Sequence, residues 1–123
     1  MLTLNSEVMK TLVFAFLFCI SFLGNSQEKQ PTFKAEKDLV KATYYYNDGA
    51  VQMQGYFKDK KLTGKWTMFD RKGDKIQTGY YKNGKKVNTW FVWNKNSLKE
   101  ITYNNNNITN VNHWKPDAVI VSN

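Results

Sequence analysis

The sequence is 123 residues long, with a formal net charge of +8, 41% hydrophobic residues and 15% aromatic residues, and this length fits one small domain. Its single cysteine, Cys19, lies in a segment that we expect to be removed, which excludes disulfides, thiol catalysis and thiolate metal sites from the remaining chain. A basic excess is typical of proteins that associate with anionic surfaces, although it also promotes solubility.

The N-terminal segment 1–26 has the pattern of a secretory signal peptide. Lys10 precedes an almost uninterrupted apolar run, 12–23, and small residues follow up to Ser26, after which we place the cleavage. The run is too short to span a bilayer, which takes about 20 apolar residues. A start at Met9 would make a cleaner signal and is the alternative. The pattern predicts a secreted protein, periplasmic or extracellular, without a transmembrane segment in the mature chain.

Beyond the signal, residues 27–40 are polar and charged, and they predict a flexible leader. Residues 41–111 alternate between turn clusters and runs rich in aromatic and β-branched residues, which is typical of short strands. We expect strands near 41–46, 51–57, 64–70, 75–82, 88–94 and 98–103. Because the connections are short, each strand must pair with the next. The predicted fold is therefore all-β, a single-layer antiparallel meander of repeated β-hairpins. Residues 112–123 form either a tail or a capping strand.

Within this region the sequence repeats itself at an offset of 24 residues. The stretch GYFKDKKLTGKWTMFD begins at Gly55, and GYYKNGKKVNTWFVWN begins at Gly79. Each copy carries two large rings three residues apart, an odd spacing that places the rings on opposite faces of a strand. Glycine in mid-strand predicts a place where a ring from the neighbouring strand lies over bare backbone. The repeat therefore predicts a sheet held together by ladders of side chains.

Rings at matching positions of successive repeats are separated by two strands, about 10 Å. Residues of the intervening strand must fill part of this gap, and we expect the fillers to be Tyr56, Tyr80 and Tyr81.

The repeated pattern resembles the MORN repeat, and most closely the bacterial variants collected as YwqK-family antitoxins. The matching positions are Gly55, Tyr56, Gly64, Trp66, Phe69 and Gly73 in the first copy, and Gly79, Tyr80, Gly84, Trp90 and Trp93 in the second. The sequence departs from the pattern at Lys60, Asn88 and Ser97, where glycine is usual. The resemblance implies an elongated hairpin meander that serves in binding or scaffolding. The antitoxin label implies a cytoplasmic protein that neutralises a toxin, which a signal segment fits poorly.

Catalytic and metal-binding patterns are absent from the sequence after the signal. His113 is the only histidine and has no carboxylate near it in sequence, and most of the acids lie in or beside turns. Similar short secreted bacterial proteins carry the name nicotinate mononucleotide adenylyltransferase, which is the remote alternative. Such an enzyme needs a Rossmann-like α/β domain, and no alternating β-α pattern is present. We therefore expect no enzyme, no cofactor and no metal.

The strongest functional pattern is a set of lysines in the two equivalent turns of the repeats. In a meander, alternate turns fall on the same side of the sheet, so these lysines predict a ridge for anionic surfaces such as lipid headgroups or glycans. The alternative is that turn lysines only keep the sheet soluble and monomeric. The predicted ridge consists of Lys58, Lys60, Lys61, Lys82, Lys85 and Lys86.

These patterns favour a non-catalytic, secreted β-repeat module of the cell envelope that binds or scaffolds. The alternative is an antitoxin or immunity-type protein that neutralises one protein partner. Aromatic rings on a sheet face are expected to be structural, although such rings also stack on sugars or protein side chains. Aromatics interleaved with lysines resemble a surface for single-stranded nucleic acid, but export makes this partner unlikely.

Overall fold

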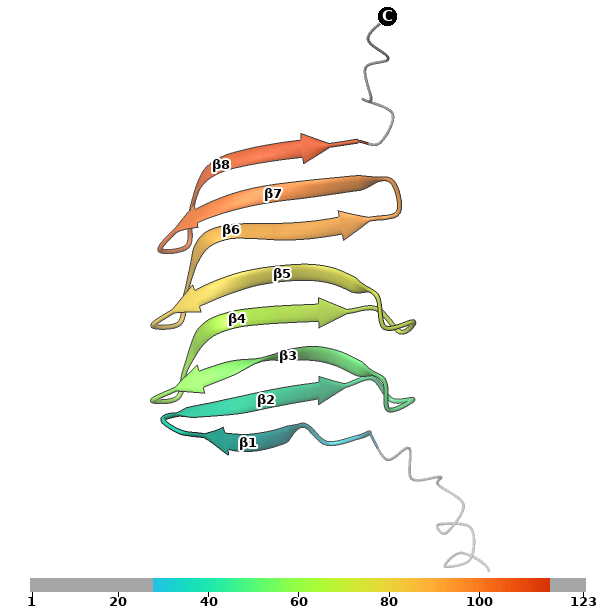
Figure 1. Cartoon of the computed structure of the whole chain (residues 1–123), viewed down its shortest axis with the longest axis vertical. Coiled ribbons are helices and arrows are strands. Elements are labelled where there is room, and N and C mark those ends of the chain that lie inside the picture. Colours follow the sequence, from blue (N-terminus) through green and yellow to red (C-terminus); the bar gives the residue numbers. More distant parts are fainter. Residues whose placement is uncertain (1–27, 116–123) are drawn as a thin grey trace, which may run out of the picture.

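The computed structural model of the protein describes residues 28–115. Eight strands form one antiparallel sheet in which the spatial order is the chain order (Figure 1). This confirms the predicted all-β meander. The strands are β1 (Thr32–Glu36), β2 (Leu39–Tyr45), β3 (Val51–Lys58), β4 (Lys61–Phe69), β5 (Lys75–Lys82), β6 (Lys85–Asn94), β7 (Ser97–Asn104) and β8 (Asn107–Trp114).

The sheet extends further at both ends than the sequence predicts. The expected leader 27–40 contains β1 and the start of β2, so the prediction of a flexible segment is wrong from Thr32 onward. Phe33 explains part of this order, because its ring packs edge-on against Tyr44 with centroids 6.3 Å apart. Likewise, β8 includes Asn112 to Trp114, the first residues of the segment predicted to be a tail or a capping strand. The expected signal segment and residues 116–123 lie outside the described residues.

Tight turns explain why consecutive strands pair. In the β3–β4 turn both central residues have positive φ, 47° at Asp59 and 64° at Lys60, and Asn83 and Gly84 repeat this in the β5–β6 turn with 50° and 78°. Two successive positive φ values define the hairpin turn whose twist matches that of the flanking strands. These two turns lie on the same side of the sheet, at the ends of the strands, and we call this side the lysine rim (Figure 1). The turns after β2, β4 and β6 form the opposite rim.

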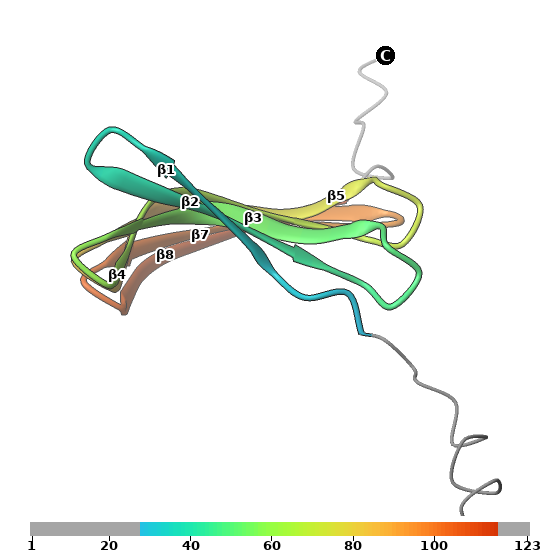
Figure 2. The same ribbon diagram turned by 90° about the horizontal axis from the view of Figure 1, so that it is seen from below.

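The sheet is thin and twisted, and its core is small (Figure 2). Of the hydrophobic residues described, only Ala42, Trp66 and Trp90 are buried, with exposed fractions of 0%, 5% and 4%. A single sheet without a second layer can bury apolar surface only between neighbouring side chains on each face. The two tryptophans are therefore the centre of the fold.

Each buried tryptophan lies over a glycine of the preceding strand. A Cβ atom added at Gly55 would meet the Trp66 ring at 1.9 Å, and one at Gly79 would meet Trp90 at the same distance. The register explains the fit, since Gly55 lies opposite a bulge of three residues, 64–66, instead of a single partner. The prediction that these glycines lie under rings is confirmed.

The rings on this face form a continuous series, and we call the face that carries Trp66 and Trp90 the ladder face. Consecutive contacts in the series have centroid distances between 5.1 and 6.4 Å, which is the range of favourable aromatic pairs. From β1 to β7 the series runs Phe33, Tyr44, Trp66, Tyr81, Trp90 and Tyr103, with Phe57 edge-on to Trp66.

The predicted fillers are correct at one position and wrong at two. Tyr81 bridges the tryptophans, with its ring 6.1 Å from Trp66 and 5.1 Å from Trp90. Tyr56 and Tyr80 instead pair with residues 63 and 65 of β4, whose side chains alternate away from Trp66 onto the other face. In the first repeat, Phe57 supplies the ring contact to Trp66, because it follows Tyr56 and lies on the ladder face.

Candidate functional site

The two lysine-bearing turns lie on the same rim of the sheet, as the meander requires (Figure 1). The β3–β4 turn joins Lys58 to Lys61, and the β5–β6 turn joins Lys82 to Lys85. The two turns are separated by two strand spacings, about 10 Å. The structure therefore brings together the six lysines that the sequence singles out, although they do not all have the same surroundings.

Lys58 is held by an acid from the neighbouring hairpin. Its Nζ lies 3.0 Å from Asp38 Oδ2, in the turn between β1 and β2. Hydrogen bonding from Lys58 lowers the pKa of the Asp38 carboxyl below its ordinary value, and the same bond raises the pKa of Lys58. Because both side chains are exposed, water screens this pair. Lys58 is thus partly neutralised by Asp38.

Lys86 lies over the ladder face. Its Nζ is 4.8 Å from the centroid of the Trp90 ring and 5.1 Å from that of Tyr103. A cation within about 6 Å of a ring face is attracted to it, and this position directs the ammonium group away from the rim. Within residues 28–115, four of the six lysines remain without an ion pair or a ring contact. We call them the rim lysines: Lys60, Lys61, Lys82 and Lys85.

The opposite rim is mixed in charge. Arg71 lies 3.8 Å from Asp48 and stacks over the Tyr46 ring at 4.6 Å. The Asp70 carboxylate accepts hydrogen bonds from the backbone amides of Lys72 and Asp74, at 2.9 and 3.0 Å. Asp70 therefore stabilises the turn between β4 and β5, which supports the interpretation of these acids as turn residues.

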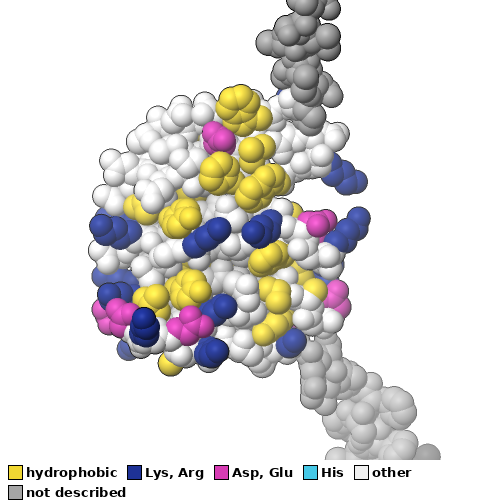
Figure 3. Space-filling model, viewed as in Figure 1, with side chains coloured by type: hydrophobic (Ala, Val, Ile, Leu, Met, Phe, Trp, Pro, Cys, Tyr) yellow, Lys and Arg dark blue, Asp and Glu magenta, His cyan; other side chains and the backbone are white. Residues whose placement is uncertain are grey.

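A second basic surface, which the sequence analysis missed, lies on the face opposite the ladder. We call this the lysine face. A groove of about 290 Å³ crosses it, with Lys41, Lys65 and Lys75 among its walls and no acidic residue. Figure 3 shows Lys and Arg side chains in the middle of the sheet, between hydrophobic ones. The repeat contained a signal for this groove, because Lys41 and Lys65 are 24 residues apart and so occupy equivalent positions.

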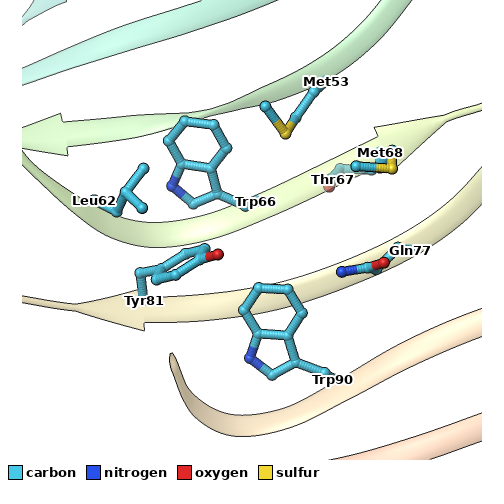
Figure 4. Close-up of a pocket in the computed structure, with 8 residues that line it drawn as sticks. All are labelled: Met53, Leu62, Trp66, Thr67, Met68, Gln77, Tyr81 and Trp90. Carbon is cyan, nitrogen blue, oxygen red and sulfur yellow. The ribbon is translucent and has the colours of Figure 1, made fainter. Parts of the chain in front are cut away.

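The ladder face carries a small apolar pocket (Figure 4). Its volume is about 140 Å³, and Trp66, Tyr81 and Trp90 form one side of it, facing Met53 and Met68. Small-ligand sites usually measure roughly 300–1,000 Å³. We interpret this pocket as a gap between the rungs of the aromatic series rather than a binding site.

The described residues contain no group of three or more His, Cys, Asp or Glu side chains that could hold a metal ion. His113 is exposed on β8, opposite Lys99 of β7. In the same part of the chain, no helix is long and apolar enough to cross a membrane.

Comparison with protein-family models gives no match to this chain, and comparison with curated proteins gives none either.

Proposed function

We propose that this protein is a non-catalytic binding module, secreted to the cell envelope, that docks on anionic surfaces through its rim lysines. The observation that carries the proposal is the uneven distribution of charge between the two rims. On the lysine rim, lysines outnumber the acids Asp38 and Asp59, and four of the lysines form no ion pair among the described residues, whereas cations and acids are mixed on the other rim. The pattern of the signal segment and the resemblance to MORN repeats support the same class of function.

The strength of such docking can be bounded. Each basic residue near an anionic surface contributes about 1 kcal/mol, so four rim lysines contribute about 4 kcal/mol. This corresponds to a Kd of about 1 mM. Docking through the rim alone is therefore weak and reversible, and it falls as salt screens the charges.

The test compares two variants of the full chain that each lose four lysines. The rim variant changes Lys60, Lys61, Lys82 and Lys85 to Gln, and the face variant changes Lys34, Lys41, Lys65 and Lys75 to Gln. Their net charges are equal, so any difference between them reports position. Binding is measured by co-sedimentation with vesicles of phosphatidylcholine containing phosphatidylglycerol, at low salt.

We expect the rim variant to bind these vesicles nearly a thousandfold more weakly than the unaltered protein, since about 4 kcal/mol of docking free energy is removed. The face variant should bind within about threefold of the unaltered protein. Equal binding by the rim variant and the unaltered protein would contradict the proposal and favour the antitoxin or immunity-type alternative.

A further inference from the structure

We infer that the groove on the lysine face binds an acidic glycan, meaning an extended chain of sugars that carry carboxylate or sulfate groups. This site shares no residue with the lysine rim, and the inference does not depend on the docking proposed above.

The groove is positively charged. Lys41, Lys65 and Lys75 line one groove, and no acid lines it with them. Within residues 28–115, none of the three forms an ion pair of 4.0 Å or less. Lys34 adds a fourth cation, because it is the direct cross-strand partner of Lys41. Like charges placed directly opposite each other destabilise a sheet, and a bound anion would relieve this repulsion.

The lysines form a long row across the sheet. The lysines belong to β1, β2, β4 and β5, so the row crosses four strand spacings, about 19 Å. A single lipid headgroup or free phosphate would contact only a part of this row. An extended polymer with a charge on successive units matches it, which favours a chain over a headgroup.

Neutral hydrogen-bonding groups and aromatic rings lie beside the lysines in the groove. Gln54 and Thr67 offer neutral hydrogen-bonding groups in the groove, and the Gln54 amide donates to Thr43 Oγ1 at 3.3 Å, which orients it. Tyr56 and Phe69 are half-buried in the walls and supply ring surface. Sugars combine hydroxyl groups, which both donate and accept, with C–H surfaces that pack on rings. A nucleic-acid backbone offers mainly acceptors and would use fewer neutral partners.

The groove also has the size that the ladder face lacks. Its volume of about 290 Å³ lies at the lower limit of small-ligand sites, whereas the apolar pocket on the ladder face measures about 140 Å³. Because the groove lies on a face of a single-layer sheet, successive units of a chain can continue beyond it.

The experiment titrates the full-length protein by calorimetry with alginate oligosaccharides, which are carboxylated, and with heparin oligosaccharides, which are sulfated. Neutral dextran and a single-stranded oligonucleotide of matched charge serve as comparison ligands. We expect one or both acidic glycans to bind, dextran not to bind, and the oligonucleotide to bind more weakly than the better glycan. The face variant should lose about tenfold or more in affinity for that glycan, since charge-assisted contacts are removed. The rim variant should change less than about twofold.

Phe69→Leu tests the ring without altering charge, and it should weaken glycan binding several-fold while leaving vesicle binding unchanged. Circular dichroism and thermal melting establish that each variant is folded. Equal losses in the face and rim variants would overturn the inference, because binding would then follow net charge alone. Tighter binding of the oligonucleotide than of either glycan would overturn it in favour of nucleic acid. Neither result bears on vesicle docking by the rim.

Discussion

Trp66 and Trp90 occupy equivalent positions, yet their indole nitrogens differ. The Trp66 Nε1–H donates to the backbone carbonyl of Tyr56 at 3.2 Å. The Trp90 Nε1 is buried and has no hydrogen-bond partner among the described residues. An unsatisfied buried polar group costs about 1–3 kcal/mol. The second repeat is thus the less well satisfied of the two at its central residue.

This difference predicts unequal costs for the same substitution. Trp66→Phe and Trp90→Phe remove similar ring volume from sites that are 5% and 4% exposed. Only the first also removes a hydrogen bond, so Trp66→Phe should reduce the free energy of unfolding by about 1 kcal/mol more than Trp90→Phe. Urea denaturation of both variants measures this difference. An equal or larger cost at position 90 would contradict the assignment of the unpaired nitrogen.

The Asp38–Lys58 pair makes a prediction about pH. Because Lys58 hydrogen-bonds the carboxylate, the pKa of Asp38 lies below its ordinary value of 3.8 in the folded protein. A carboxyl with a lowered pKa stabilises the fold above its unfolded pKa, and this contribution is lost as the pH falls through the folded pKa. An NMR titration should show Asp38 below 3.8, and Lys58→Gln should return it towards that value. An unchanged Asp38 pKa in Lys58→Gln would exclude the pair.

At the scale of the hairpin, the two lysine-rim turns have similar backbone geometry but different residues. The second central position has φ of 64° at Lys60 and 78° at Gly84. Left-handed backbone suits glycine and is strained for a residue with a Cβ atom. The bulges show the same exchange, because Gly64 has φ of 64° and its equivalent Asn88 has 60°. Asparagine tolerates this region better than lysine does.

Exchanging these residues tests the account of the turns. Lys60→Gly should raise the free energy of unfolding by about 1 kcal/mol, and Gly84→Lys should lower it by a similar amount. Thermal unfolding of the two variants measures both effects. Repeating both measurements at high salt separates backbone strain from charge, because salt screens the repulsion among the turn lysines and leaves the backbone strain unchanged. A destabilising Lys60→Gly would contradict the explanation.

At the scale of the molecule, the repeat made the ladder predictable. Gly55 and Trp66 recur 24 residues later as Gly79 and Trp90. A glycine in mid-strand, beside a strand that carries a tryptophan, indicates a ring over bare backbone. The tyrosines were harder to place. Tyr56 and Tyr80 each precede a ladder-face residue by one position, and a shift of one residue moves a side chain to the other face.

The unpredicted parts depend on contacts between distant residues. Strand β1 is short and largely polar. It is held by the ring contact of Phe33 with Tyr44 and by the ion pair of Asp38 with Lys58. A local sequence pattern shows neither contact. The pairing of Lys58 and the position of Lys86 over rings reduce the predicted ridge to four lysines. The groove needs residues from β2, β3, β4 and β5 on one face, which only the bulged register brings together.

Residues 28–115 therefore form a single sheet with one structural face, one basic face and one basic rim. Its net charge of +8 alone does not distinguish the last two. The central claim is that anion binding follows the position of the lysines and not the net charge of the chain.

The most direct test titrates the rim variant and the face variant, which have the same net charge, against phosphatidylglycerol vesicles under one set of conditions. The account predicts that the rim variant binds the vesicles nearly a thousandfold more weakly and that the face variant retains binding within about threefold. Equal affinities of the two variants for the vesicles would contradict the account, because charge would then act without regard to where it lies.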